Sequence, residues 1–443
     1  MRHAARWTLA RGALIATAIA IAAPSIAPSI AEATPPDLFG YGARTPGLGF
    51  TGVSFVDDYE AVYTNPAGLG RVRRRALVLG LSAGAFDLTL DGERAPVTPS
   101  RGMTIGFQLP IPFGDVLQDR LVLGGGFWTP AAVLLHGEVA FPEVPQWPVL
   151  ERTQSIAIQL GLGFDFHGIV DGLTVGVGVS ALANVVGDLD VRLDETNSFT
   201  SVVETQLLTT FSPLVGVMYN APEWGVGAVY RHEVRSEMDL RIVTRDLPVV
   251  LPVVSVAGLI QYDPPTVAAE GYWRPIPDVR IALQAAVRFW SAYAGPYRPT
   301  SANSFLPPAP GFSDMFVPRI SIEGTLRSGL VELQLRGGYS MELSPSPPAR
   351  LAPERDSMGR PRVEMGSGVL RPIRFIDNDR HVLTAGLGLR YRYSETGRIT
   401  FDAFGQVHIL ADRTHDIGAT EGAAPMRSGG YALAGGWTMG LEF

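Results

Sequence analysis

The sequence predicts an all-β protein that closes into a transmembrane antiparallel β-barrel of about 14 strands. Three observations support this prediction: strands that alternate between an apolar and a polar face, connections that are alternately short and long, and a last strand that ends in an aromatic residue. Glycine occurs 50 times and proline 35 times, while charged residues make up only 18% of the chain. This composition is typical of strands and turns. An open sheet edge in lipid leaves backbone groups unpaired, so such a chain crosses a membrane only as a closed sheet.

The first 33 residues are predicted to be a cleavable secretory signal. Basic residues precede an apolar run, and small residues follow it, which is the order typical of such signals. The run has about 11 residues, where a membrane-spanning helix needs roughly 20. We expect cleavage after Ala33, with Ala27 as the alternative. The chain contains no cysteine, so no lipid-modified cysteine or disulfide is expected in the exported protein.

Period-2 alternation runs through the rest of the chain. Between residues 331 and 341, one face carries Val331, Leu333 and Leu335, and the other carries Glu332 and Arg336. The predicted strands are 75–89, 100–109, 120–130, 153–166, 172–187, 204–219, 224–242, 264–274, 279–292, 315–327, 330–342, 380–393, 398–411 and 430–443.

The spacing of the connections distinguishes a membrane barrel from a soluble sandwich, which also alternates. Almost every second connection is short, as at 220–223 and 328–329, and residues 110–118 are the exception. The intervening connections are longer, as at 296–310 and 343–379. Short periplasmic turns and long outer loops are typical of outer-membrane barrels, and an even strand count then places both chain ends in the periplasm.

The last strand carries a further signal. One of its faces is apolar and includes Trp437 and the terminal Phe443. Alternating hydrophobes that end in an aromatic residue resemble the segment by which the barrel-assembly machinery recognises outer-membrane proteins. The alternative is a secreted soluble protein that merely ends in a strand.

A Gly-rich segment at 42–53 is followed by Asn65, Pro66, Ala67, Gly68 and Leu69. This combination resembles the N-terminal plug of the FadL/TodX family of outer-membrane transporters. Weaker similarities follow in family order at 126–130, 227–231, 377–380 and 383–388. Phe50 and the pair Tyr59-Glu60 depart from the small residues that are usual in the family's plug, which bears on the identity of the ligand.

The resemblance implies a plug at 34–74 inside a barrel at 75–443, in the outer membrane of a Gram-negative bacterium. It implies a monomeric channel for hydrophobic small molecules, long-chain fatty acids or hydrocarbons, in contact with outer-membrane lipid and lipopolysaccharide. Ligand capture by outer loops, binding in the lumen and lateral release through a kink in the third strand would follow. A long acyl chain gains about 0.8 kcal/mol per methylene on leaving water, so release into the membrane avoids a costly return to water.

Two segments are candidate functional sites. Gly124, Gly125, Gly126 and Pro130 form the candidate lateral gate, because glycines followed by proline favour a bulge or kink in a strand. Their alternative role is to leave room for the plug. The loop at 131–152 is the candidate capture loop, through apolar residues that a solvated loop normally avoids: Leu134, Leu135, Phe141 and Trp147. The alternative for this loop is packing over the barrel mouth or contact with lipopolysaccharide.

Other chemistry is not expected. A net charge of −7 disfavours nucleic-acid binding. The GxGxxG at 47–52 lacks the βαβ context of a dinucleotide site and is interpreted as plug turns. Asp57 and Asp58 are expected to be solvated or to form a salt bridge from plug to wall, and the histidines lack metal-ligand spacing. We therefore expect no cofactor, metal or catalytic residue, and no enzyme. A docking or shuttle role in a secretion or surface-assembly system stays as the alternative to transport.

Overall fold

The computed structural model describes residues 35–95, 97, 99–112, 120–131, 135–136, 154–193, 199–245, 254–295, 305–348, 350–356, 358–373, 375–416 and 425–443. Everything described here belongs to one compact unit, Ala31–Phe443. The expected signal segment lies outside the described residues. No helix in the described part of the chain is long and apolar enough to cross a membrane.

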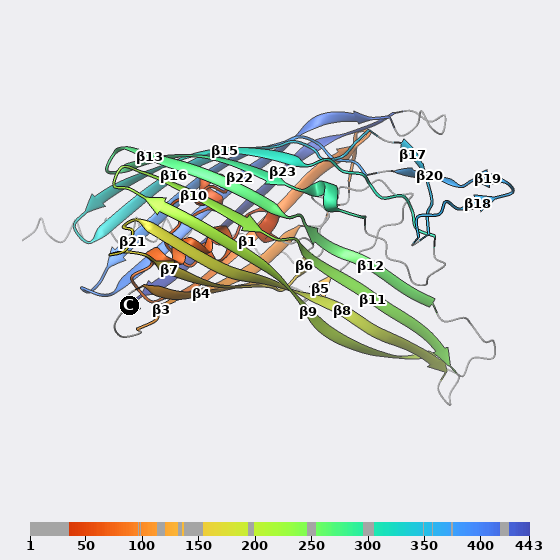
Figure 1. Cartoon of the computed structure of the whole chain (residues 1–443), viewed down its shortest axis with the longest axis horizontal. Coiled ribbons are helices and arrows are strands. Elements are labelled where there is room, and N and C mark those ends of the chain that lie inside the picture. The colour runs from red at the N-terminus through yellow and green to blue at the C-terminus, as the bar shows by residue number, and fades with distance from the viewer. Residues whose placement is uncertain are drawn as a thin grey trace, which may run out of the picture. The chain divides into compact units, whose positions relative to one another are not determined.

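Fourteen antiparallel strands of the described chain close into a barrel (Figure 1), as the sequence predicts. They are β1 (Ala76–Leu90), β3 (Ser100–Pro110), β4 (Leu121–Pro130), β7 (Ala157–Asp165), β8 (Leu173–Leu193), β9 (Phe199–Asn220), β10 with β11 (Trp224–Arg231 and Val234–Arg245), β12 with β13 (Val254–Asp263 and Thr266–Ile276), β14 (Val279–Arg288), β15 (Met315–Ser328), β16 (Val331–Glu342), β21 (Arg380–Arg392), β22 (Arg398–His415) and β23 (Met426–Glu442). The barrel closes where β1 pairs with β23, from Ala76 opposite Glu442 to Leu90 opposite Ser428.

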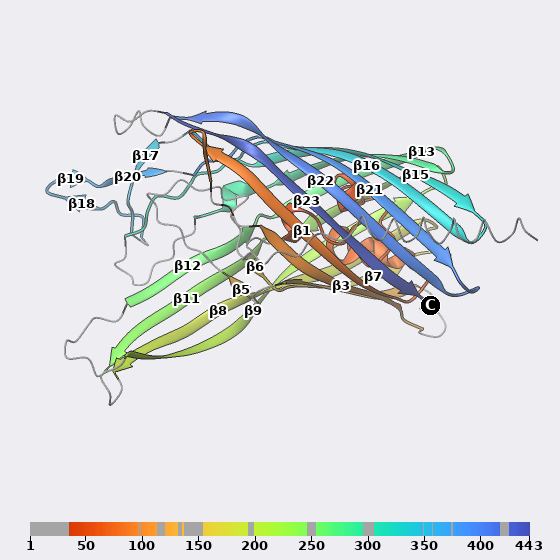
Figure 2. The ribbon, with the colours of Figure 1, turned by 180° about the vertical axis from the view of Figure 1, so that it is seen from behind.

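The parity of the connections is as predicted. Short turns join β9 to β10, β13 to β14 and β15 to β16 at one end, which also holds the C-terminus (Figures 1 and 2). The long connections β14–β15 and β16–β21 lie at the other end, called the outer end below. Alternation is confirmed as well: Leu77, Leu79 and Leu81 are about half exposed on the outer wall, whereas Glu323 and Arg336 are buried in the lumen.

Some boundaries differ from the prediction. β8 and β9 extend further outward than expected, to Leu193 and from Phe199. The segment β12 was missed, because Pro264 and Pro265 interrupt the pattern and a strand start was placed there. Short strands in the β16–β21 connection were also missed: β17 (Arg350–Pro353), β18 (Val363–Glu364), β19 (Ser367–Gly368) and β20 (Leu370–Ile373).

Toward the outer end, the strands of the β8–β9 hairpin change the neighbours with which they pair. Near the short turns, β8 pairs with β7 and β9 pairs with β10. Beyond Leu182, where the β7 pairing ends, the free edge of β8 is taken by β11, which runs parallel to it from Met238 to Arg245. The result is a projecting sheet in the order β9–β8–β11–β12 (Figures 1 and 2). The β8–β9 hairpin thus presents the edge of β9 to β10 near the short turns and the edge of β8 to β11 at the outer end. The strong twist of two-stranded ribbons accounts for this change of edge.

The segment from Pro35 to the start of β1 lies inside the barrel as a plug. It contains α2 (Pro35–Leu38), η1 (Pro46–Leu48), α3 (Ala61–Thr64) and η2 (Pro66–Arg71), which are the red and orange coils within the wall in Figure 1. Most of its residues are buried, including polar ones such as Asn65 and Glu60. The plug is therefore the core of the barrel.

Candidate functional site

Asn65 of the plug motif links the plug to the barrel wall. Its Oδ1 caps η2 by accepting a hydrogen bond from the backbone N–H of Ala67, at 3.1 Å. Its Nδ2 donates to the carbonyl of Val53 at 2.6 Å, and to the wall carbonyls of Val217 and Ala228 at 3.3 and 3.4 Å. Pro66 follows at the first position of η2, where its missing N–H costs nothing. The motif is thus an anchor for the plug.

Wall glycines let the plug backbone approach closely. A Cβ on Gly176 would lie 2.1 Å from the carbonyl carbon of Pro66, and one on Gly338 would lie 2.3 Å from that of Leu48. Any side chain there would overlap the plug, so only glycine fits. The same holds for further wall glycines whose role the sequence pattern did not reveal: Gly163, Gly216 and Gly227. In the GxGxxG segment, Gly49 and Gly52 have positive φ, as predicted, whereas Gly47 packs against Gly386.

One half of the wall holds the plug by polar contacts. The carboxylate of Glu270 on β13 accepts hydrogen bonds from the backbone N–H of Gly52 at 2.7 Å, and from the N–H and hydroxyl of Ser54 at 2.9 and 2.6 Å. Gln406 on β22 donates to the carbonyls of Phe39 and Pro46 at 3.1 and 3.0 Å. Each contact satisfies a polar group that burial would otherwise leave unpaired.

The opposite half of the wall meets an apolar face of the plug. Gly124 on β4 lies against Val62 and Leu69, and Tyr41 both lies against Gly126 and donates to the carbonyl of Ile105 at 3.0 Å. The cluster that includes Tyr41, Val62 and Leu69 continues to Val122 and Trp128 of β4 and to Ala157 of β7. The plug is therefore attached asymmetrically.

The candidate gate differs from the prediction in one respect. In the described ladder, β4 pairs with β3 from Val122 to Pro130 and with β7 from Leu121 to Trp128, without a register shift. The ladder has no β-bulge at Gly124–Gly126, and the lateral gate stays a prediction. Gly124 and Gly126 leave room for plug side chains, and the ring of Phe107 lies over Gly125. Both edges of the strand stay hydrogen-bonded, so three glycines did not suffice to break it.

The capture loop lies largely outside the described residues, including Leu134, Phe141 and Trp147. Leu135 lies in β5 (Leu135–His136), which pairs with β6 (Gln154–Ser155). The capture role of these residues stays a prediction.

The residues of the insertion signal lie on the outer wall. The ring of Trp437 stacks on that of Phe401 at 6.2 Å, and Phe443 is 56% exposed. The backbone of Phe443 pairs with that of Arg75 at the start of the barrel, with N–O distances of 3.0 and 3.2 Å.

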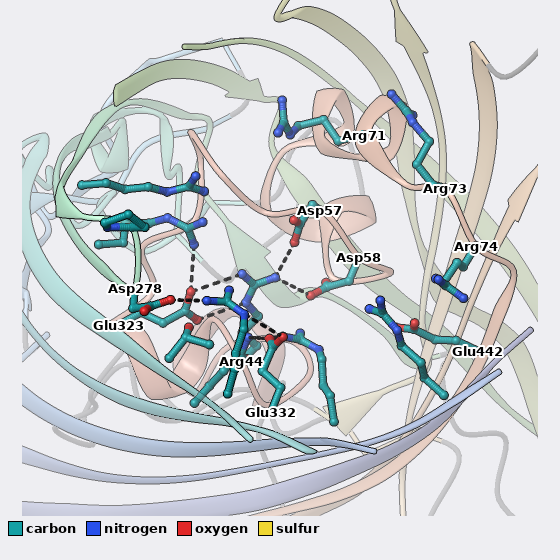
Figure 3. Close-up of a pocket in the computed structure, with 18 of the residues that line it drawn as sticks. Arg44, Asp57, Asp58, Arg71, Arg73, Arg74, Asp278, Glu323, Glu332 and Glu442 are labelled. Carbon is teal, nitrogen blue, oxygen red and sulfur yellow. Dashed lines mark hydrogen bonds and ion pairs between the residues drawn. The ribbon is translucent and has the colours of Figure 1, made fainter. Parts of the chain in front are cut away.

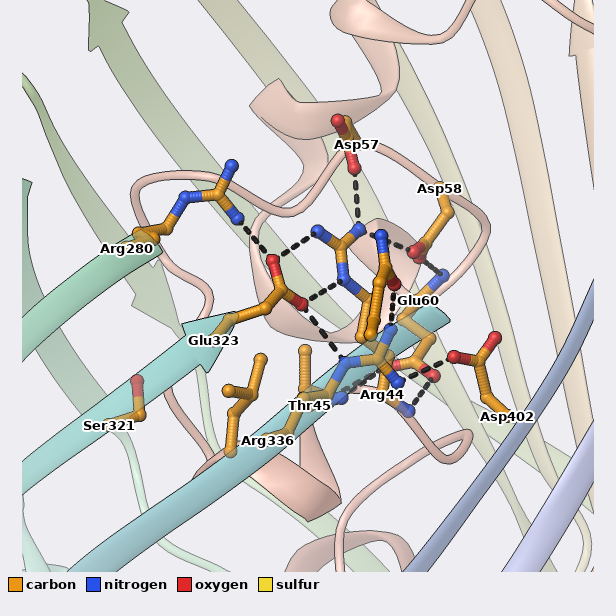
Figure 4. Close-up of polar contacts among 12 residues, drawn as sticks. Arg44, Thr45, Asp57, Asp58, Glu60, Arg280, Ser321, Glu323, Arg336 and Asp402 are labelled. Atoms are coloured by element: carbon orange, nitrogen blue, oxygen red, sulfur yellow. Dashed lines mark hydrogen bonds and ion pairs between the residues drawn. The ribbon is translucent and has the colours of Figure 1, made fainter. Parts of the chain in front are cut away.

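A buried ion network fixes the plug near the short-turn end (Figure 4). Arg44 NH1 lies 2.6 Å from Asp57 and 2.9 Å from Asp58, and its Nε lies 3.4 Å from Glu323 on β15. Both aspartates thus face Arg44 within the plug, and Asp57 is also 44% exposed to solvent. The direct plug-to-wall bridge that was expected of them is made by Arg44 instead. Glu323 also contacts Arg336 at 3.0 Å. Breaking one partner of such a buried pair typically costs about 3–5 kcal/mol.

Glu60, which the sequence marked as a departure from the family pattern, organises the first turn of the plug. Its two carboxylate oxygens accept hydrogen bonds from the backbone N–H groups of Ala43, Arg44 and Thr45 and from the Thr45 hydroxyl, at 2.7–2.8 Å. Gly42 lies against this carboxylate with a φ of 85 degrees, and a Cβ there would lie 2.2 Å from Oε1 of Glu60, so no side chain fits. Burial and the nearby Asp58 raise the pKa of Glu60 to about 7, although the hydrogen bonds lower it.

A small cavity of about 70 Å³ lies between the plug and the outer half of the lumen. The charged residues that line it are three arginines and two carboxylates: Arg231, Arg288, Arg319, Asp37 and Glu342. Arg288 is paired with Asp37 and lies 3.6 Å from Glu342. Arg231 and Arg319 make no salt bridge with described residues, and the Nε atom of each is buried without a hydrogen bond. The lining therefore carries one unbalanced positive charge.

Aromatic rings from the outer loops pack near this cavity. Trp290 and Phe312 lie 5.9 Å apart between ring centroids, Tyr293 stacks on Phe312 at 5.6 Å, and Phe375 lies 5.5 Å from Phe312. They share a buried cluster with Val53 of the plug. The sequence analysis missed this cluster, although the aromatic run at 289–297 was a signal for it.

A contact between His415 and Ser428 bears on enzymatic activity. His415 Nε2 lies 2.7 Å from the Ser428 hydroxyl, which donates to Asn378 Oδ1 at 3.0 Å. The Ser428 hydroxyl proton is thus directed at the amide, and Ser428 is 1% exposed. A nucleophile requires the opposite arrangement, with its proton held by the base and its oxygen accessible. The described residues also contain no cluster of three metal-binding side chains.

The barrel resembles solved structures more clearly than it resembles known sequences. No family model and no curated protein matches the chain. A FadL homologue of Pseudomonas aeruginosa matches with a TM-score of 0.56 at 13% identity, covering 91% of this chain and 97% of the other. The toluene transporter TodX of P. putida matches with 0.52 at 14% identity, covering 92% and 99%. The CymD monoaromatic hydrocarbon channel matches with 0.50 at 14% identity, covering 91% and 98%. At these identities the likeness establishes the fold.

Proposed function

We propose that this FadL/TodX-type barrel is an outer-membrane channel for the uptake of hydrophobic small molecules, and that long-chain fatty acids are its ligands. The structural neighbours are a FadL homologue, a toluene transporter and a monoaromatic hydrocarbon channel, which supports a hydrophobic cargo. The exposed apolar residues of the outer wall support a position in the membrane, with the short turns facing the periplasm.

The cavity of about 70 Å³ between the plug and the outer half of the lumen is called the outer cavity here. Its net positive charge is the observation that favours a fatty acid over a neutral hydrocarbon. Three arginines and two carboxylates line it, so a single carboxylate head group would balance the remaining positive charge. Arg231 and Arg319 have no acidic partner among the described residues and each holds an unused buried donor. A toluene-like hydrocarbon would leave this net positive charge unbalanced, because it has no group that accepts a hydrogen bond from a guanidinium.

The route that we propose begins at the outer loops. An acyl chain would pack against the rings of Trp290, Tyr293 and Phe312 while its carboxylate reached the arginines of the cavity. The ligand would then pass along the apolar contact of the plug with β4 and leave sideways near Gly124–Gly126. On this side, plug displacement breaks apolar contacts, the hydrogen bond of Tyr41 and the ion pair of Arg73 with Asp165 on β7. The other side is held by buried polar groups. Because β4 is unbroken, the exit would open by movement of the plug.

The test compares a fatty acid with its methyl ester. Binding of palmitate and of methyl palmitate to the purified barrel is measured for the parent, for Arg319→Met and for Arg231→Met. A hydrogen bond to a charged group is worth about 1.5–3 kcal/mol, so palmitate binding should weaken at least about tenfold in each variant. Binding of the ester should change little. Arg327→Met, at the exposed short-turn end, is the matched control.

Cellular uptake distinguishes transport from docking. Cells that depend on this barrel should take up labelled palmitate, and Arg319→Met should reduce that uptake. Equal binding of acid and ester would refute the carboxylate site and leave a channel for neutral compounds. Absence of uptake of both compounds in the parent would favour the docking or shuttle role.

A further inference from the structure

A second, larger cavity opens at the short-turn end, beneath the plug (Figure 3). Its volume is about 360 Å³, and its lining comes from the plug and from the ends of wall strands. We call it the vestibule. Nine arginines and six carboxylates line it, so its lining carries three net positive charges in a chain whose net charge is −7. The lining of the vestibule is therefore positively charged, although the chain as a whole is negatively charged.

Five of the nine arginines of the vestibule have carboxylate partners. Arg73 pairs with Asp165, and Arg327 and Arg390 each pair with Glu332. Between plug and wall, Arg44 bonds to Asp57, Asp58 and Glu323, and Arg280 bonds to Glu323 at 2.8 Å. These pairs hold the plug and leave little capacity for a ligand.

Four other arginines have no salt bridge with any described residue: Arg71, Arg74, Arg274 and Arg398. Arg71 donates to the neutral amide of Asn220 at 3.0 Å, Arg74 donates to the carbonyl of Thr396, and Arg274 lies over the ring of Tyr272 at 5.4 Å. Arg71 and Arg74 belong to a basic run that ends the plug, and Figure 3 shows both beside the vestibule. Four guanidinium groups without a carboxylate partner among the described residues thus surround one cavity, and they are called the free arginines below.

We propose that the vestibule is a binding site for a small polyanion with two or more phosphate or carboxylate groups, entering from the periplasm. Guanidinium groups bind both kinds of oxyanion through paired, charge-assisted hydrogen bonds. The free arginines come from the plug, from β13 and from β22, so a ligand that reaches several of them carries more than one anionic group. This site is separate from the outer cavity, because the plug lies between the two.

The experiment uses inorganic pyrophosphate as the probe. Its binding to the purified barrel in a nonionic detergent is followed by calorimetry at about 0.15 M salt, where the Debye length of about 8 Å suppresses loose attraction. Saturable binding of about one pyrophosphate is expected. Arg71→Gln and Arg398→Gln should each weaken binding about tenfold. Arg75→Gln is the matched control, since Arg75 is exposed and belongs to the same basic run but does not line the vestibule.

Each outcome decides the proposal. Absence of saturable binding, or equal weakening by Arg75→Gln and Arg71→Gln, would overturn it. Unboiled gel migration confirms that each variant is a folded barrel. Displacement of pyrophosphate by soluble short-chain cardiolipin, which carries two phosphates, would identify lipid head groups as a source of the anion, and displacement by citrate alone would identify a free periplasmic anion. Palmitate binding in the outer cavity is measured in the same variants, so failure of one site does not imply failure of the other.

Discussion

Gly176 of β8 and Pro66 of the plug approach so closely that a Cβ on the glycine would lie 2.1 Å from the proline carbonyl carbon. Gly176→Ala should therefore force the plug and the wall apart. Overpacking of this kind costs about 1–3 kcal/mol. We expect a barrel that assembles but conducts small ions more readily in a planar bilayer.

Gly405→Ala is the control for this prediction, because no atom lies within 4 Å of the position that its Cβ would take. Its conductance should equal that of the parent. A Gly176→Ala barrel as tight as the control would show that the plug contact tolerates a methyl group.

The seating of the plug should depend on pH through Glu60. The folded structure raises the pKa of this carboxyl to about 7, above its ordinary value of 4.5. The folded plug therefore favours the protonated form of Glu60. The stabilisation of the folded state that this form provides is fully present below about pH 4.5 and is lost as the pH rises through 7. Ion leakage should be lower at pH 5 than at pH 8, and Glu60→Gln should remove this difference.

Asp377 provides the comparison for the pH experiment. Burial raises the pKa of Asp377, in the connection before β21, to about 7 as well. If Glu60 is the group that matters, Asp377→Asn should keep the pH dependence of the leak. Persistence of the dependence in Glu60→Gln would assign it to another group.

The terminal aromatic residue should control barrel assembly. Phe443 is exposed on the outer wall, and its backbone pairs with Arg75 at the seam. Phe443→Asp, or deletion of Phe443, should reduce the amount of assembled barrel in the outer membrane, measured by faster gel migration without boiling. Export should be unchanged, because the predicted secretory signal lies at the other end of the chain. Normal assembly of both variants would show that this strand is not the recognition signal.

The gate can be tested at Gly125, over which the ring of Phe107 lies. Gly125→Val should block fatty-acid uptake if ligand leaves through this part of β4, while the barrel stays folded and tight to ions. Gly337→Val, at an outward-facing glycine of β16 with no atom closer than 3.9 Å, should transport normally. Normal uptake by Gly125→Val would place the exit elsewhere.

The period-2 pattern was sufficient to predict the wall, because lipid and lumen impose opposite chemistry on successive residues of each strand. It predicted a strand at 224–242, which covers most of β11, but not the strand with which β11 pairs. The strand β11 pairs with β8 through residues such as Met238 and Val185, and no local pattern encodes a partner so far along the chain. The unbroken β4 is a second case: Gly124–Gly126 weaken a strand locally, but pairing on both edges keeps it in register.

The lumenal site was harder to predict for the same reason. The sequence shows that Arg319 and Glu323 belong to a polar face, but it does not show which of them has an oppositely charged partner. Arg44 and Glu323 are 279 positions apart and meet only when the barrel encloses the plug. Glu60 looked like a deviation in a family motif, and only the folded turn shows the four hydrogen bonds that require it.

The pairing of β1 with β23 also determines when, during synthesis and folding, the plug becomes enclosed. The plug is synthesised before any strand, yet it is enclosed only when the last strand, Met426–Glu442, reaches β1. Its polar anchors lie on β13 and β22, so they are not available until most of the chain has been made. Until then the plug and every unpaired strand edge stay exposed, and such edges aggregate. The closing contact between β1 and β23 therefore also encloses the plug, so barrel closure and plug seating are one event.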